Sequence, residues 1–274
     1  DLSLGFHTDA GITSGDTVLL KDLDSGSAVG APDDQLGISD PFAVLDASTA
    51  VFRADNGPAG GQLWVTDGTT GGTNLVDGDL RPSHLTAIGN EAFFQAYDAT
   101  HGTEFWVTDG TSGGTSMVAD INPNPVGPGN QGSSQPGYFT AFEDQVLFLA
   151  DDGTHGRELW SHDLSTGQTQ MLKDINPSGS SVEFSHTAPH FSVVGDYAVF
   201  AADNGVNGRE LWVTDGTTDG TSMLADINGG SGSSYPQDFV EFGDQVLFRA
   251  DDGGSAGDEL WTTDGTPDNT GRLK

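Results

Sequence analysis

Short apolar segments rich in Val, Phe, Leu and Thr alternate with polar turns along almost the whole chain. Runs such as "QVLFLADDG" and "YAVFAADNG" are typical of strands that end in Asp-Gly or Asn-Gly, because these residues tolerate the positive φ of tight hairpins. No stretch repeats its apolar residues with the period of a helix. The pattern therefore predicts an all-β chain.

The same four apolar segments recur five times along the sequence. The clearest landmark is a Trp inside a phrase such as "RELWVTDGT", which occurs at Trp64, Trp106, Trp160, Trp212 and Trp261. Two apolar segments precede this phrase and one follows it, such as "TSMLADI". Four antiparallel strands in a repeat of roughly 50 residues indicate a β-propeller blade. The five repeats thus predict a five-bladed β-propeller.

We interpret the chain as a single propeller domain, 1–274, with repeats at about 41–80, 83–121, 137–175, 189–227 and 237–274. The segment "DTVLLKDL" (16–23) resembles a fourth strand without its own first three strands. We therefore expect this segment to close the ring beside the last repeat, with strands from both ends of the chain. The C-terminal "DNTGRLK" also resembles the start of a fourth strand, so either one segment is surplus or the chain belongs to a longer array.

The repeated phrases resemble those of the bacterial ELWxxDGT-repeat family, whose units combine Ala-Asp-Asp-Gly, Gly-x-Glu-Leu-Trp, Asp-Gly-Thr and a later Val-or-Leu-x-Asp-Ile. The resemblance runs from about residue 16 to the end and is best at 145–160 and 208–228. It implies a secreted or cell-surface bacterial protein with a propeller-like fold, and no agreed activity or catalytic residues. Two units depart from the pattern: the third has "HDLS" (162–165) in place of Asp-Gly-Thr, and the first has Gln62 in place of Glu.

Positions that recur in every unit are those that every blade needs, so we expect them to be structural. Alternate residues of a strand face opposite sides, which predicts that Leu211 and Val213 pack on one neighbouring blade and Trp212 on the other. The alternative is that the Trp rings serve as platforms for sugar stacking. The Asp of each Asp-Gly-Thr should cap its own turn, at Asp67, Asp109, Asp215 and Asp264. The recurring Glu should meet a backbone donor or an Arg of its own loop, at Glu104, Glu158, Glu210 and Glu259.

The chain is strongly acidic, with 41 Asp and Glu against 9 Lys and Arg and a formal net charge of −32. Binding to phosphate needs basic residues, so this balance predicts no nucleic-acid partner. No apolar run is long enough to cross a bilayer, which predicts no membrane insertion. The absence of Cys excludes disulfides and thiolate chemistry. The first residues do not resemble a signal peptide, so we expect such a segment to have been removed or never present.

Clustered carboxylates with Gly suit Ca²⁺, which takes six to eight oxygen ligands. The acidic loops therefore make calcium the candidate cofactor, with candidate ligands at Asp151, Asp152, Asp203, Asp251 and Asp252. These loops lack the alternating D-x-D-x-D spacing of a calcium loop. The alternative interpretation is that they are ordinary hairpin turns, since Asp-Gly and Asn-Gly serve that purpose too.

Residues that vary against the constant repeat are the better candidates for function, because loops on a rigid scaffold commonly carry it. The links between repeats are long and irregular, and the residue near the start of each first strand varies. We expect these residues to ring the mouth of the central channel: Asp40, His84, Tyr138, His190 and Asp238. His101 and His155, in hairpins on the same side, are further candidates. Such a ring could bind a metal, supply acid and base groups, or only line a wet channel.

The sequence contains no Gly-x-Ser-x-Gly, His-Glu-x-x-His or phosphate-loop motif. The leading hypothesis is a secreted, non-enzymatic module that recognises polysaccharide or a cell-surface glycan through loops on one propeller face. The first alternative is a structural or adhesive repeat domain of a larger surface protein. The second is a polysaccharide hydrolase or lyase with an axial site.

Overall fold

The structure is a computed structural model that describes residues 42–55, 61–125, 131–182 and 191–273. Three of the sequence-based predictions lie outside these residues: Asp40, His190 and the closing segment 16–23.

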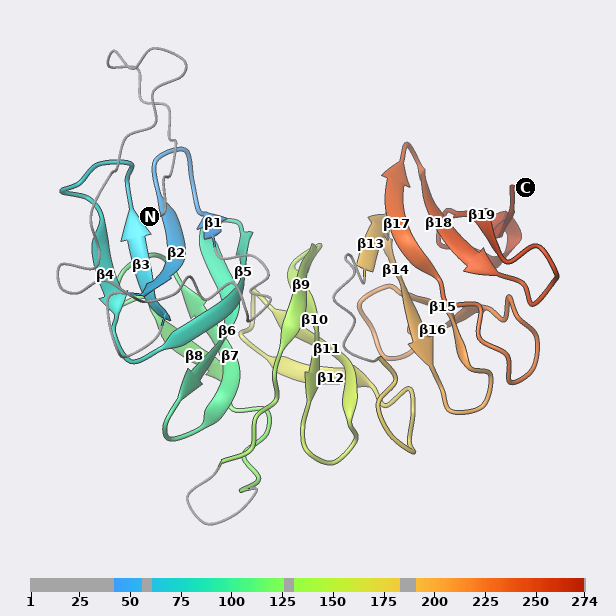
Figure 1. The fold of residues 1–274 in the computed structure, drawn as a ribbon, viewed down its shortest axis with the longest axis horizontal. Coiled ribbons are helices and arrows are strands. Elements are labelled where there is room, and N and C mark those ends of the chain that lie inside the picture. Colours follow the sequence, from blue (N-terminus) through green and yellow to red (C-terminus); the bar gives the residue numbers. More distant parts are fainter. Residues whose placement is uncertain (1–41, 56–60, 126–130, 183–190, 274) are drawn as a thin grey trace. The chain divides into compact units, whose positions relative to one another are not determined.

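The described strands form five separate four-stranded antiparallel sheets, which we call blades 1 to 5 (Figure 1). In every blade the four strands lie in chain order, each pairing with the next. Within the described residues there is no α-helix, and the single helical element is η1 (Pro267–Asn269) in blade 5. The predicted all-β fold of four-stranded antiparallel blades is confirmed.

Blade 1 consists of β1 (Phe42–Val44), β2 (Ala50–Asp55), β3 (Gly61–Thr66) and β4 (Asn74–Asp77). Blade 2 consists of β5 (Arg81–Ile88), β6 (Glu91–Asp98), β7 (Gly102–Thr108) and β8 (Ser116–Ala119). Blade 3 consists of β9 (Gly137–Phe142), β10 (Gln145–Asp151), β11 (Arg157–Asp163) and β12 (Thr169–Lys173). Blade 4 consists of β13 (Phe191–Val194), β14 (Tyr197–Asp203), β15 (Arg209–Thr214) and β16 (Ser222–Ala225). Blade 5 consists of β17 (Gln237–Phe242), β18 (Gln245–Asp251), β19 (Asp258–Thr263) and β20 (Gly271–Arg272).

The chain divides into two compact units, residues 1–135 with blades 1 and 2, and residues 136–274 with blades 3 to 5. In the second unit, the fourth position of blade 5 is taken by β20, so the C-terminal segment occupies the place that the sequence also suggested for 16–23. In the part of the chain that the structure describes, no helix has the length and apolarity needed to cross a bilayer.

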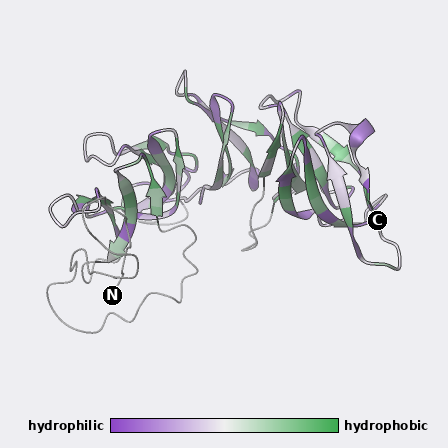
Figure 2. Cartoon of the chain, turned by 90° about the horizontal axis from the view of Figure 1, so that it is seen from above, coloured by the Kyte–Doolittle hydropathy of each residue, from purple (hydrophilic) through white to green (hydrophobic). Residues whose placement is uncertain are grey.

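Each blade has two different apolar faces, and within each unit the core lies between consecutive blades. We call the side that bears the Trp of the third strand the Trp face, and the opposite side the Leu face. Trp212 packs with Leu147 and Leu159 of blade 3, whereas Leu211 and Val213 pack in the cluster that contains residues of blade 5. The predicted alternation of Leu211, Trp212 and Val213 is therefore confirmed. Figure 2 shows the hydrophobic residues concentrated along the strands.

Candidate functional site

The recurring Glu of the third strand is a buried anchor for the link that leaves its blade. Glu210 has no exposed surface, and its Oε2 accepts hydrogen bonds from the Ile227 backbone N–H at 2.7 Å and the Ser234 hydroxyl at 2.6 Å. Its Oε1 accepts from the Ser234 backbone N–H at 2.9 Å. One carboxylate thus holds both the exit of β16 and the far end of the following link. The expected backbone donor for this Glu is confirmed.

The same arrangement recurs in blades 2 and 3. Glu104 accepts from the Ile121 backbone N–H at 2.8 Å and from the hydroxyl of Ser134, and Glu158 accepts from the backbone N–H groups of Ile175 at 3.0 Å and Ser181 at 3.1 Å. The links between repeats are therefore not irregular throughout, because each of these three is fixed at a Gly-Ser-Ser sequence. The three sequences are Gly132-Ser133-Ser134, Gly179-Ser180-Ser181 and Gly232-Ser233-Ser234.

A Gly is required two residues before the recurring Glu, because the link passes close to its backbone. Gly208 has a φ of +74°, and a Cβ there would lie 2.3 Å from the Gly232 carbonyl oxygen and 2.6 Å from Ser233 Oγ. The next residue, Arg209, donates its backbone N–H to Ser233 Oγ at 2.9 Å. The hairpins between the second and third strands and the links between blades therefore lie on the same side of the blade, as predicted.

Burial sets the ionisation of these anchors. It raises the pKa of Glu158 to about 7, although Ser181, Ile175 and Asn176 donate hydrogen bonds that act in the opposite direction. The pKa values of Glu104 and Glu210 are raised for the same reason. Carboxylates with raised pKa values also occur in catalytic sites. Here, however, each one is enclosed by its own blade and is occupied by structural donors.

The acidic residues of the turns are also used internally. Asp215 Oδ1 accepts from the Thr217 backbone N–H at 2.9 Å and its hydroxyl at 2.6 Å, and the other three Asp-Gly-Thr turns have the same bonds. The predicted Asp caps are therefore confirmed. Asp163 caps the "HDLS" turn, which replaces Asp-Gly-Thr in the third repeat, in the same way. The hydrogen bond from the Ser165 hydroxyl helps to lower the pKa of Asp163 to about 2.

The two candidate hairpin histidines form Asp–His pairs within their own loops. His101 Nδ1 lies 2.8 Å from Asp98 Oδ2, and His155 Nδ1 lies 2.7 Å from Asp152 Oδ2. Hydrogen bonding to the neighbouring carboxylate raises the pKa of each imidazole. Both side chains are more than one-third exposed. Each pair closes one loop of one blade.

The varying residues of the first strands share an uncommon backbone conformation. His84, Tyr138 and Asp238 have φ values of +57°, +62° and +57°. Each lies where the pairing of the first and second strands shifts register, so two residues of the first strand oppose one of the second. Left-handed backbone is costly for residues other than Gly and is concentrated at functional sites. The structure thus places three of the five predicted residues at the same bulge of three different blades.

Blade 5 joins one of these residues to a charged group that the sequence analysis did not single out. Arg249 Nε donates to Asp238 Oδ2 at 2.9 Å, and Arg249 Nη1 donates to Asp258 Oδ2 at 2.9 Å. All three side chains are substantially exposed. Tyr235, three residues before Asp238, has a φ of +49° and is 57% exposed. The sequence analysis did not single out Tyr235 either, although an aromatic residue in a Ser- and Pro-containing link could have pointed to it. No sequence signal pairs Arg249 with Asp238, because the fold alone brings them together.

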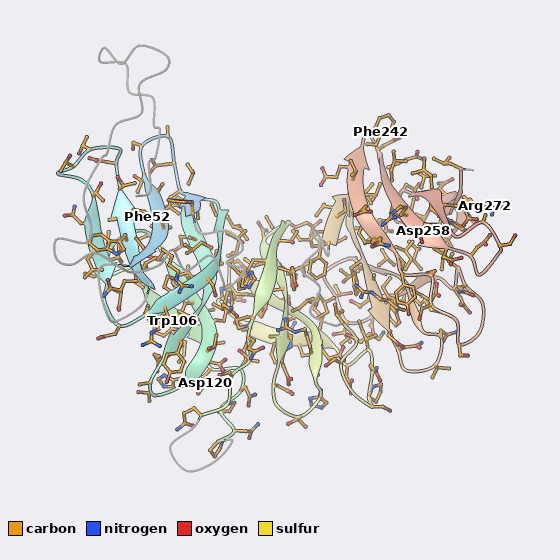
Figure 3. The ribbon with its side chains drawn as sticks, in the orientation of Figure 1. Phe52, Trp106, Asp120, Phe242, Asp258 and Arg272 are labelled. Atoms are coloured by element: carbon orange, nitrogen blue, oxygen red, sulfur yellow. The ribbon has the colours of Figure 1, made fainter. Side chains whose placement is uncertain are left out.

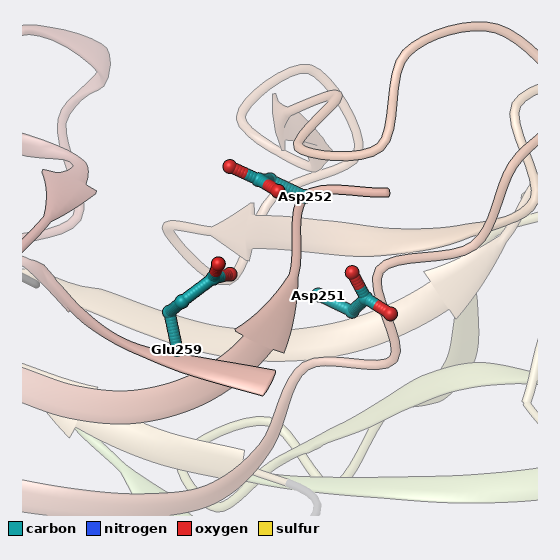
Figure 4. A group of neighbouring side chains, drawn as sticks. All are labelled: Asp251, Asp252 and Glu259. Carbon is teal, nitrogen blue, oxygen red and sulfur yellow. The ribbon is translucent and has the colours of Figure 1, made fainter. Parts of the chain in front are cut away.

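The five candidate calcium ligands differ in their surroundings. Asp151, Asp203 and Asp251 each accept a backbone N–H of their own turn, from Gly153, Gly205 and Gly253. Asp252 accepts the backbone N–H of Gly254, and Asp152 is paired with His155. Among the described residues, one group of three carboxylates could hold a metal ion, and it combines Asp251 and Asp252 with Glu259 (Figure 4).

Comparison with known proteins supports the fold. No family model and no curated protein matches the chain. One of two prolyl endopeptidases analysed for inter-domain dynamics is similar, with a TM-score of 0.53 and 14% identity over 94% of this chain and 38% of that chain. Prolyl oligopeptidase B from Galerina marginata matches with a TM-score of 0.52 and 11% identity, over 85% and 33% of the two chains. A puromycin hydrolase matches with a TM-score of 0.50 and 15% identity, over 79% and 33%.

The chain therefore spans about a third of the length of these structures. Because the identities are low, the likeness concerns the fold, and the matched regions are β-propeller domains. Together with the five four-stranded sheets, this assigns the chain to the β-propeller class of all-β folds.

Proposed function

We propose that this β-propeller is a non-enzymatic binding module of a secreted or cell-surface bacterial protein, and that it recognises polysaccharide or a cell-surface glycan. The observation that carries the proposal is that the recurring and the varying polar residues have different structural roles. Those that recur in every blade cap turns or anchor links, whereas the varying residues occupy left-handed bulges. The varying set is therefore the better candidate for contact with a glycan.

Blade 5 supports a glycan as that ligand. Asp238, Arg249 and Asp258 offer exposed donors and acceptors, and Tyr235 offers an exposed ring. Exposed ion pairs contribute little to folding, so this group is not explained by stability. Sugars present hydroxyls and apolar ring faces, which carboxylates, guanidinium groups and aromatic rings can bind together.

The test is a glycan array followed by calorimetric titration of each glycan that binds. We expect Asp238→Asn and Tyr235→Ala each to weaken binding at least tenfold. Asp219→Asn makes the same charge change on a different exposed turn and should have no effect. Absence of binding to any glycan, or equal affinities for all three variants, would refute the proposal. Turnover of a bound glycan that Asp238→Asn abolishes would favour the enzymatic alternative.

A structural or adhesive repeat domain is the second candidate, and the Leu face of blade 5 supports it. Phe242, at the end of β17 (Figure 3), is 67% exposed, and Leu260 and Leu273 are also exposed. Phe142, at the same position of blade 3, is 2% exposed because blade 4 covers it. The face of blade 5 therefore has the composition of a surface that receives another blade. Concentration-dependent association in sedimentation experiments, abolished by Phe242→Ser, would support this function.

A further inference from the structure

We propose that Asp251, Asp252 and Glu259 form a calcium site specific to blade 5. Each of the three side chains offers one oxygen, and these oxygens all lie within 4.8 Å of one another. A calcium ion about 2.4 Å from each ligand can bridge oxygens separated by up to about 4.8 Å. Figure 4 shows the Glu259 carboxylate directed toward Asp252.

Glu259 supplies a second, independent observation. It is 9% exposed, and among the described residues its Oε2 has no hydrogen-bond partner. The equivalent oxygen of Glu210 in blade 4 accepts from Ile227 and Ser234. An enclosed carboxylate oxygen without a donor is costly, so this atom calls for a hydrogen-bond donor or a cation.

The hairpin of blade 5 also differs from its counterpart in blade 3. There, the Asp152 carboxylate is paired with His155, but blade 5 has "DDGGSAGDE" and no His in this loop. Asp252 Oδ2 instead lies 2.8 Å from Arg272 Nη1, which is also 3.2 Å from Glu259 Oε1. In blade 5, Asp252 therefore shares a cationic partner with Glu259 instead of pairing with a His of its own loop.

The charge of the cluster fits a divalent cation. Three carboxylates and one guanidinium leave two uncompensated negative charges in a chain whose net charge is already −32. Arg272 is half-exposed and lies in a two-residue strand, so its side chain can turn toward solvent when an ion binds. The three carboxylates would supply part of the six to eight oxygens that calcium takes, and water the remainder. Arg272 would then act as a competitor of calcium.

The experiment is calorimetric titration of the chelator-treated 274-residue chain with Ca²⁺ at physiological ionic strength. We expect one Ca²⁺ per chain, at least tenfold weaker binding in Glu259→Gln, and tighter binding in Arg272→Ala because the competing cation is gone. Asp151→Asn alters the equivalent residue of blade 3 and should leave the affinity unchanged. Circular dichroism of each variant checks that the sheets are intact.

Three results would overturn the proposal. One is the absence of saturable binding below about 1 mM, the weak end of extracellular calcium sites. Another is unchanged affinity in Glu259→Gln. The third is an equal response to Mg²⁺ that persists in Glu259→Gln, because that would indicate general screening of the acidic surface.

Discussion

The buried anchor of blade 4 allows a sharp test of what stabilises these repeats. Glu210→Gln keeps the size of the side chain but replaces the carboxylate with a neutral amide. Three close hydrogen bonds, from the Ile227 N–H and from the N–H and O–H of Ser234, then lose their charged acceptor. Glu259 is the matched control, because it occupies the same position in blade 5 and receives none of these donors.

The magnitude follows from the strength of hydrogen bonds to charged groups. These contribute about 1.5–3 kcal/mol each, against about 0.5–1.5 kcal/mol for neutral pairs, so three bonds lose about 3 kcal/mol together. The amide also avoids the cost of burying a charge, the same cost that raises the pKa of Glu210. We therefore expect Glu210→Gln to lower the free energy of unfolding by about 2 kcal/mol at alkaline pH. This corresponds to a Tm lower by about 4–8 °C in a chain of this size.

The assay is urea and thermal unfolding in the presence of a chelator, which removes any contribution of calcium at Glu259. Glu259→Gln should change stability by less than about 1 kcal/mol, because its Oε2 has no hydrogen bond to lose and its Oε1 is bonded only to the half-exposed Arg272. The deficit of Glu210→Gln should widen as the pH falls, because the raised pKa lets native Glu210 take up a proton before the unfolded chain does and the parent chain gains stability that the Gln variant cannot gain. Equal losses of unfolding free energy in the two variants, or a Glu210→Gln variant as stable as the parent chain, would refute the stabilising role of Glu210.

Three further predictions concern glycine, pH and the exposed apolar face. Gly208→Ala should destabilise the chain by more than about 2 kcal/mol, because the added Cβ would collide with the link at Gly232 and Ser233. Gly257→Ala is the control: its φ is also positive, at +77°, but no atom lies within 4 Å of the added Cβ, so it should cost about 1 kcal/mol. Similar unfolding midpoints for the two variants would contradict this prediction. The pKa of Glu158 is about 7 in the folded chain and 4.5 in the unfolded chain. Its contribution to stability is therefore fully present below pH 4.5 and is lost as the pH rises toward 7. The urea concentration at the unfolding midpoint should fall over this window, and should fall less in Glu158→Gln. Phe142→Ala should cost about 3–5 kcal/mol and Phe242→Ala less than about 1 kcal/mol; a large loss at Phe242 would show that its face is covered in solution.

The regular part of this fold was predictable because its signals are local. Strand segments, chain-order sheets, the caps at Asp215 and its counterparts, and the opposite facing of Leu211 and Trp212 all follow from residues close together in sequence. Such features depend on a period of two and on turn chemistry, both of which one chain displays directly.

The anchors and the candidate ligand site depend on contacts distant in sequence. The Ser that binds the buried Glu lies 30, 23 or 24 residues farther along the chain, at Ser134, Ser181 and Ser234. Because the links differ in length, no fixed spacing marks these pairs. The pairing of Arg249 with Asp238 is hidden for the same reason, since it depends on a bulge that shifts the register of two strands. Asp40 and His190 remain predictions.

The anchor has a consequence for how such repeats can be shortened, exchanged or duplicated. Although β16 ends at Ala225, the bonds to Glu210 extend as far as Ser234. The carbonyl oxygen of Ser234 in turn accepts the Asp251 N–H of the next blade at 2.9 Å. A truncation after Ala225 would remove every donor of a buried carboxylate, whereas one after Ser234 would retain them. The unit that can be removed or duplicated intact therefore ends one link later than the four-stranded sheet that the repeat encodes.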